Sequence, residues 1–149
     1  MTASASATID APIDKVWDAF VNPEKIKKYM FGTTVITDWK KGHKILWQGQ
    51  WQGKTYEDKG VILEFKPKTK LQYSHFSPLA GQPDRPENYH IVTIVLTDTG
   101  AQTTVLLSQS NSGSEQEKAH SEQNWAAMLG SVKKLIEEPD EKNNGTSRT

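Results

Sequence analysis

The sequence from Ser114 to Glu138 reads SEQEKAHSEQNWAAMLGSVKKLIEE and predicts one long helix. Its apolar residues recur every three or four positions, which places them on one face of a helix. Ser114, followed three residues later by Glu117, fits a capping box that would begin the helix, and Pro139 would end it. The apolar stripe comprises Trp125, Met128, Leu129, Val132, Leu135 and Ile136.

The first two turns of this helix present a different face. Continuing the stripe toward the N-terminus reaches Lys118 and Ser121, with Glu122 at its edge, so the stripe becomes polar. The second half of the helix is therefore expected to pack on a sheet, while the first half roofs an opening. We predict a sheet that grips one long helix and leaves a space between them.

Between Thr33 and Asn111 the apolar pattern changes to a period of two, which is typical of strands with one buried face. Short turn signals separate the runs, and strands joined by short turns pair antiparallel. We predict a meander of six to seven strands with one face toward the long helix. The expected shared faces are Val35, Thr37 and Trp39; Ile45, Trp47 and Trp51; Val61, Leu63 and Phe65; Leu71, Tyr73 and His75; His90, Val92, Ile94 and Leu96; and Thr103, Val105, Leu107 and Gln109.

The N-terminal part predicts one strand and two short helices. Residues 3–10 are expected to form the strand. Pro12 suits the start of a helix whose apolar face carries Ile13, Val16, Trp17 and Phe20. Asn22-Pro23 predicts the start of a second helix, with Asn22 as its cap, and Gly32 predicts its end. The fold class is therefore α+β.

Composition excludes several classes of function. The 149 residues carry 18 basic and 18 acidic side chains, and no basic patch of the kind that nucleic-acid binding needs. No apolar run approaches the ~18 residues of a membrane span, and no signal peptide is recognisable, so we expect a cytoplasmic protein without a membrane partner. The absence of cysteine removes disulfides, thiolate catalysis and cysteine-based zinc sites. We expect one domain over residues 1–138 and a disordered tail over 139–149.

Histidines and carboxylates offer no metal site. His43, His75, His90 and His120 lack ligand spacing, and His120 lies away from the helix stripe and is expected to face solvent. Neither a metal nor a cofactor is predicted. Glu57, Asp58 and Glu64 are interpreted as a solvated face, because neighbouring strand residues point to opposite sides and cannot flank one substrate bond.

Several short motifs together resemble a known family. Thr8-Ile9-Asp10-Ala11-Pro12, then Val16-Trp17 and Pro23-Glu24, are similar to the opening of proteins like the C-terminal domain of the activator of the ninety-kilodalton heat-shock-protein ATPase (the AHSA-type family). This family lies within the START-like, or SRPBCC, helix-grip superfamily. The resemblance continues through Gly60-Val61, Pro67, Leu71, the hairpin at Gly100, and His120 to Leu129 with Trp125, and covers residues 7–138.

The resemblance implies a helix-grip fold with a hydrophobic cavity, on a scaffold that hosts carriers, cyclases and regulators. Two positions depart from the family pattern. Tyr29-Met30-Phe31 stands where members commonly have a tryptophan, and His75 where they have an aromatic residue. Both positions would line the cavity in the family's fold. Helix-grip relatives are often dimers, which makes a homodimer one expected partner arrangement.

The leading hypothesis is a non-catalytic protein that binds a small hydrophobic or amphipathic molecule, lipid-like or polyketide-like, in this cavity. Aromatic walls with a few polar groups are typical of such sites, although the same aromatics would also fill a core. The residues predicted to contact the ligand are Trp17, Phe20, Trp47, Tyr73, His75, His90, Gln109, Trp125, Met128 and Leu129.

Two other hypotheses remain open. The family resemblance implies a regulator of a chaperone ATPase, with the chaperone as partner and a role in the stress response. The third hypothesis is a cyclase or hydrolase that uses His75 or His90 as a base, since imidazole titrates near neutral pH. The loop from Ser77 to Asn88 is long for a hairpin and is interpreted either as a lid over the site or as a cover for the sheet edge.

Overall fold

The computed structural model describes residues 1–138, without the side chain of Trp51. The predicted helix stop at Pro139 and the predicted disordered tail lie outside these residues. The elements run in the order β1 (Ala3–Ile9), α1 (Ile13–Val21), α2 (Pro23–Tyr29), β2 (Thr34–Ile36), β3 (Lys44–Trp51), β4 (Lys54–Lys66), β5 (Lys70–His75), η1 (Pro78–Ala80), η2 (Pro86–Asn88), β6 (His90–Asp98), β7 (Thr103–Gln109) and α3 (Glu115–Glu137).

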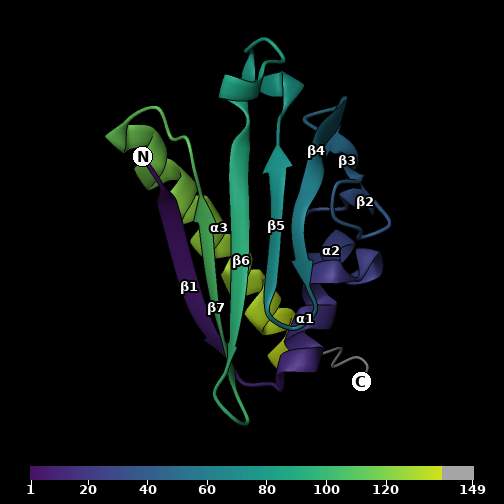
Figure 1. The fold of residues 1–149 in the computed structure, drawn as a ribbon, viewed down its shortest axis with the longest axis vertical. Helices are drawn as coiled ribbons and strands as arrows, with labels where there is room; N and C mark the ends of the chain where they lie inside the picture. The colour runs from purple at the N-terminus through teal and green to yellow at the C-terminus, as the bar shows by residue number, and fades with distance from the viewer. Residues whose placement is uncertain (139–149) are drawn as a thin grey trace.

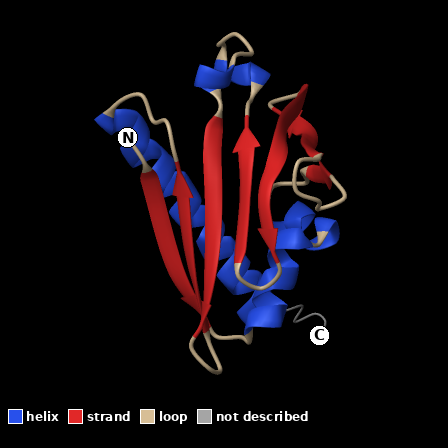
Figure 2. Cartoon of the chain, in the orientation of Figure 1, coloured by secondary structure: helices blue, strands red, loops and turns tan. Residues whose placement is uncertain are grey.

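The described residues form one seven-stranded sheet in the order β1-β7-β6-β5-β4-β3-β2, and every neighbouring pair is antiparallel. This confirms the predicted meander and the α+β fold class. Helix α3 crosses one face of the sheet diagonally, and α1 and α2 lie near its C-terminal half (Figure 1). Within residues 1–138, the opposite face of the central strands carries no helix (Figure 2).

Helix α3 begins and packs as its sequence predicts. The Ser114 hydroxyl accepts a hydrogen bond from the Glu117 N–H at 3.1 Å, while the Glu117 carboxylate accepts from the Gly113 N–H at 3.0 Å, one residue before the position in a standard capping box. Three residues of the apolar stripe are buried: Leu129, Val132 and Ile136. The other three, Trp125, Met128 and Leu135, are partly buried.

The C-terminal end of α3 is fastened to the start of the chain. Glu137 accepts hydrogen bonds from the Asp10 N–H and from the Lys133 ammonium, each at 2.7 Å. The Lys133 ammonium also donates to the Thr8 carbonyl at 2.7 Å. The bond from Lys133, followed by that from Asp10, holds the pKa of the Glu137 carboxyl below its usual value. These contacts fix the C-terminal half of α3, which is the lower half in Figure 1, and do not involve the N-terminal or upper half.

Strand β4 contains one extra residue that changes which side chains face α3. Its register with β5 shifts between Ile62, opposite Tyr73, and Glu64, opposite Gln72. Such a β-bulge reverses the alternation of side chains along the strand. Phe65 therefore shares the inner face with the fully buried Ile62 and not with Val61 and Leu63, whose predicted place on that face is wrong.

The predicted strand at Val35, Thr37 and Trp39 is too long. Strand β2 ends at Ile36, and Trp39 adopts a left-handed backbone with φ of 60°. A left-handed residue cannot continue an extended strand. The Trp39 ring instead packs on Phe65 with ring centroids 6.0 Å apart.

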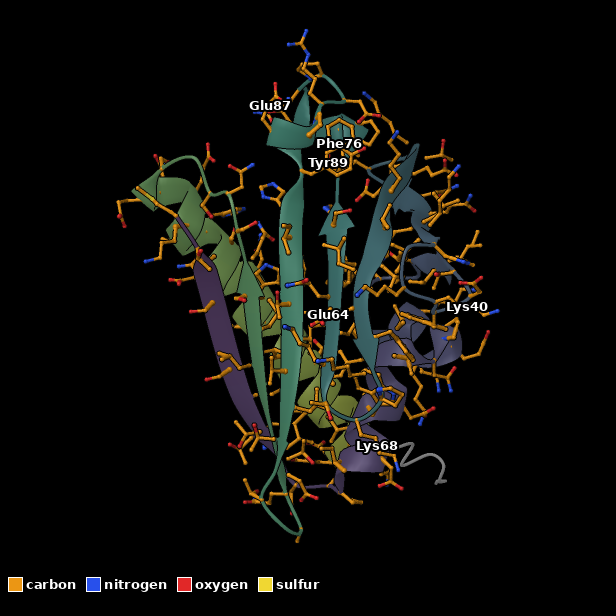
Figure 3. The ribbon with its side chains drawn as sticks, viewed as in Figure 1. Lys40, Glu64, Lys68, Phe76, Glu87 and Tyr89 are labelled. Carbon is orange, nitrogen blue, oxygen red and sulfur yellow. The ribbon has the colours of Figure 1, made fainter. Side chains whose placement is uncertain are left out.

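The loop from Ser77 to Asn88 caps the end of the sheet. Tyr89, directly after the loop, stacks on Phe76 with ring centroids 5.1 Å apart, and the Tyr89 hydroxyl donates to Asp84 at 2.7 Å (Figure 3). Asp84 also forms an ion pair with Lys59 of β4. Because Phe76 points away from the face that carries His75, these contacts support the edge-cover interpretation of the loop.

Gly60 is required where β4 and β5 approach each other closely. A Cβ atom at Gly60 would lie 1.7 Å from the Ser74 carbonyl oxygen, whereas a Cβ atom at Gly130 of α3 would meet nothing within 4 Å. We expect Gly60→Ala to lower the free energy of unfolding by about 2 kcal/mol or more. Gly130→Ala is the matched control and should raise it by up to ~1 kcal/mol, because alanine favours the helix. Chemical denaturation measures both values, and a Gly60→Ala protein as stable as the wild type would contradict this account.

Candidate ligand-binding site

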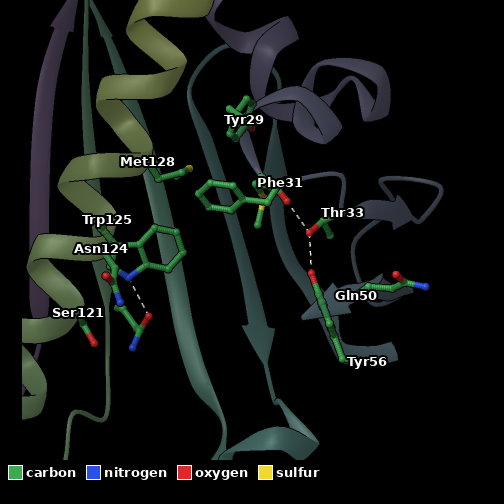
Figure 4. Close-up of a pocket in the computed structure, with 11 residues that line it drawn as sticks. Tyr29, Phe31, Thr33, Gln50, Tyr56, Ser121, Asn124, Trp125 and Met128 are labelled. Carbon is green, nitrogen blue, oxygen red and sulfur yellow. Dashed lines mark hydrogen bonds between the residues drawn. The ribbon is translucent and has the colours of Figure 1, made fainter. Parts of the chain in front are cut away.

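A pocket of about 300 Å³ opens between the upper half of α3, the end of α2 and the curled strands β3 and β4; it is called the outer chamber below (Figure 4). Phe31 stands at its rim with 94% of its surface exposed and a left-handed backbone, φ 53°. The lining residues are Tyr29, Met30, Phe31, Thr33, Gln50, Tyr56, Gln109, Ser121, Asn124, Trp125 and Met128.

A second pocket of about 100 Å³, the inner chamber, lies deeper against the sheet. It shares five lining residues with the outer chamber, so the two adjoin. The shared residues are Met30, Thr33, Tyr56, Gln109 and Trp125, and the inner chamber adds Trp47, Asp58, Tyr73, His75 and Val92.

Trp125 lies at the junction of the two chambers, and its position is fixed by a hydrogen bond. Its indole N–H donates to the Gln109 side-chain oxygen at 2.8 Å. A buried indole needs such an acceptor, since an unpaired N–H is costly away from water. The bond joins the sheet to α3 at the helical turn where the apolar stripe begins.

A chain of hydroxyl groups holds the segment that forms the rim. The Thr33 hydroxyl donates to the Met30 carbonyl at 2.7 Å and lies 2.6 Å from the Tyr56 hydroxyl. Because the single Thr33 proton is used on Met30, the Tyr56 hydroxyl is the donor to Thr33. These bonds fasten the segment containing Phe31 to strand β4.

The floor of the inner chamber holds a carboxylate and an imidazole from neighbouring strands. The Asp58 Oδ2 atom lies 2.9 Å from His75 Nε2, and 14% of the Asp58 side chain and 28% of the His75 side chain are exposed. A carboxylate only accepts, so His75 Nε2 carries the proton and donates. The interpretation of Asp58 as part of a solvated face is wrong, because Asp58 is opposite the inward-facing Trp47 in the sheet register.

Aromatic rings surround this pair. The Trp47 ring lies 5.0 Å from the Tyr73 ring and 5.0 Å from the His75 ring, measured between centroids. Burial raises the pKa of the Tyr73 hydroxyl, which therefore stays neutral under ordinary conditions. The inner chamber thus combines aromatic side chains with one carboxylate, that of Asp58.

The structure brings together six of the ten residues predicted to contact a ligand. Trp47, Tyr73 and His75 line the inner chamber, Met128 lines the outer one, and Gln109 and Trp125 line both.

The other four lie elsewhere. Phe20 lines neither chamber but borders a void of about 30 Å³ that adjoins them through Trp47, Tyr73 and Trp125, and Leu129 is buried in the core. Trp17 packs on Phe65 with ring centroids 5.4 Å apart, because α1 lies at the far end of the sheet. His90 lines an open polar groove beside α3, which it shares with the exposed His120.

Residue patterns alone missed the rim and Asp58. The rim residues Met30, Phe31 and Thr33 follow α2 in a segment without periodicity, and only the family resemblance placed Tyr29-Met30-Phe31 at the cavity. Asp58 had a usable signal, since pairing β3 with β4 places it opposite Trp47, which was expected to face inward.

Residues 1–138 contain no group of three or more His, Cys, Asp or Glu side chains able to hold a metal ion. No helix in the same range is long and apolar enough to cross a membrane.

The fold and the pocket together define a helix-grip protein. Residues 10–137 match the family described as activator of Hsp90 ATPase homolog 1-like protein. The chain belongs to this family. No curated protein matches the sequence.

Solved structures agree with this assignment. The solution structure of ChR145 from Cytophaga hutchinsonii is 56% identical, with 93% of this chain and 94% of that chain covered and a TM-score of 0.84. The fold is also similar to DynU16, a protein in the dynemicin biosynthetic locus (18% identity, 91% and 47% covered, TM-score 0.75). The Aha1 dimer from Colwellia psychrerythraea is 19% identical, with 92% and 96% covered and a TM-score of 0.70.

The hydroxyl chain at the rim makes a testable prediction. Tyr56→Phe removes the donor to Thr33, and Thr33→Val removes both the acceptor and the bond to Met30. Tyr56→Phe should lower the free energy of unfolding by about 1 kcal/mol, the usual value of one hydrogen bond, and Thr33→Val by about 2 kcal/mol, because it removes two. The double variant should lose less than the sum of the two, because both share one bond. Denaturation of all four proteins measures this coupling, and strict additivity would show that the Thr33–Tyr56 bond contributes nothing.

Proposed function

We propose that this protein binds a small apolar or amphipathic molecule in the outer and inner chambers, without transforming it. The observation that carries the proposal is the shape of the chambers, which lie between α3 and the sheet and are walled by aromatic and methionine side chains with few polar groups. Such a lining is typical of small-molecule sites. The presence of a relative in a biosynthetic locus agrees with a natural-product ligand.

Apolar burial would supply most of the affinity. A ligand that buries about 200 Å² of apolar surface gains ~5 kcal/mol at ~25 cal/mol per Å². Part of this gain is offset by the loss of ligand motion, so affinity of about 1 mM is expected for small compounds. Trp125 and Met128 would contact the body of the ligand from α3, and Met30 and Tyr56 from the other side.

A blocking substitution tests the proposal. Ser121 lines the outer chamber, and Ser121→Phe would place a ring in it. Ala127 is exposed on the same helix and lines neither chamber, so Ala127→Phe is the matched control. The neutral dye N-phenyl-1-naphthylamine should bind the wild type and the control with a rise in its fluorescence. Its affinity for Ser121→Phe should fall about tenfold or more, since the ring takes up the space.

Equal dye binding by all three proteins would place the dye outside the chambers. No binding of the dye or of other hydrophobic compounds by the wild type would refute the proposed function itself.

Two other functions keep some support. Family membership supports regulation of a chaperone ATPase, and the dimeric Aha1 structure supports a homodimer. Unchanged ATP turnover by the cognate chaperone would exclude the first, and a monomeric mass in sedimentation would exclude the second. The Asp58–His75 pair supports an enzyme, because a carboxylate commonly orients a histidine base. Unaltered turnover of a candidate substrate by His75→Gln would remove this residue from any mechanism.

A further inference from the structure

We infer that the inner chamber selects an amphipathic amine, whose ammonium group binds Asp58 while its apolar part occupies the outer chamber. The inference rests on the proposed function and specifies the chemical class of the ligand. It depends on three features of the chamber: an unpaired carboxylate oxygen, aromatic walls, and the charges of the lining residues.

The first feature is the second oxygen of the Asp58 carboxylate. Oδ2 is paired with His75, whereas Oδ1 is buried and has no hydrogen-bond partner among the described residues. An anionic oxygen without a donor is costly in a protein interior. A ligand donor that reaches Oδ1 from the inner chamber, through a small shift of the side chains around Asp58, would remove this cost, and only a donor can do so, because a carboxylate cannot donate.

The second feature is the ring system around Asp58. Four aromatic side chains line the inner chamber: Trp47, Tyr56, Tyr73 and Trp125. The negative face of an aromatic ring attracts a cation, and this attraction grows where water is excluded. Rings beside a carboxylate favour an ammonium group over a neutral hydroxyl, which gains only the hydrogen bond.

The third feature is the charge of the lining. Among the described residues that line the two chambers, Asp58 is the only carboxylate, and none is lysine or arginine. His75 is already committed to Asp58 through Nε2. An anionic head group, such as that of a fatty acid, would therefore meet a like charge without a cation to bind it. The charge of the lining therefore disfavours binding of acids and favours binding of amines.

A series of three matched probes tests this selectivity. Octylamine, 1-octanol and octanoate share the same chain and differ in the head group, which is cationic, neutral or anionic at neutral pH. The formal net charge of the protein at pH 7 is +0, so long-range attraction does not bias the series. NMR titration that follows the indole N–H signals of the tryptophans gives both the dissociation constant and the location. We expect octylamine to bind about tenfold more tightly than octanoate, with octanol between them.

Two substitutions separate the local carboxylate from other causes. Asp58→Asn keeps the size of the side chain and removes its charge, so octylamine should bind about tenfold or more weakly and octanoate more tightly. Glu57→Gln makes the same change at the next residue, whose exposed side chain points to the other face and accepts from Gln48. It should leave all three dissociation constants within about twofold.

The outcomes distinguish the two proposals. If all three probes bind the wild type equally, or if Asp58→Asn affects octylamine no more than Glu57→Gln does, selection of amines is refuted while ligand binding stands. If none of the probes binds, both proposals fail. The order of affinities in the wild type decides the inference even if Asp58→Asn does not fold.

Discussion

The extra residue in β4 is the constraint on which the interior depends. Phe65 faces inward. If side chains alternated without interruption from Phe65 toward the start of β4, the charged side chains of Lys59 and Glu57 would also face inward. The bulge between Ile62 and Glu64 shifts the alternation by one position. Tyr56 and Asp58 then face inward, and Gly60, two residues after Asp58, allows the close approach of the β5 backbone at Ser74.

A bulge also bends the strand that contains it and increases its twist. The upper part of β4, together with β3 and β2, curls away from the plane of the central strands (Figure 1). Helix α3 remains in contact with β1 on the other side, so the curl creates room between the helix and the strands. The same local irregularity therefore provides both the space of the chambers and the side chains that line it.

The two halves of helix α3 have different roles: the C-terminal half packs in the core, and the N-terminal half lines the outer chamber. The half after Trp125 is held by buried apolar residues and by the contacts of Lys133 and Glu137 with the start of the chain. The half before it presents Ser121 and Asn124 to the outer chamber. Because the lower half supplies the packing energy, the upper half can stand away from the sheet at little cost in stability.

Much of this arrangement could be predicted from the sequence. Period-two patterns, turn residues and the stripe of α3 follow local rules, and they gave the antiparallel meander, the helix and the direction of Trp47, Tyr73 and His75. The bulge could not be predicted, because the sequence of β4 alone carries no sign of it. Its position is defined by how β4 pairs with β5. The error about the faces of Val61 and Leu63 follows from that single residue.

Residue patterns could not predict the rim for a different reason, and only the family resemblance placed Tyr29-Met30-Phe31 at the cavity. Met30, Phe31 and Thr33 are positioned by a left-handed turn and by the hydroxyl of Tyr56, which is more than twenty residues away in the sequence. Local propensity carries no information about such a contact. The strands and helices can therefore be predicted from periodic sequence patterns, whereas the pocket cannot, because it forms where those patterns are interrupted.

Asp58 is also where the demands of folding and of binding differ most clearly. Two buried side-chain atoms lack hydrogen-bond partners among the described residues, Ser112 Oγ and Asp58 Oδ1. A hydroxyl can rotate and loses little, but an anionic oxygen retains a large need for solvation. An apolar residue would pack there without this cost, so the carboxylate is better explained by what the chamber receives than by the stability of the fold.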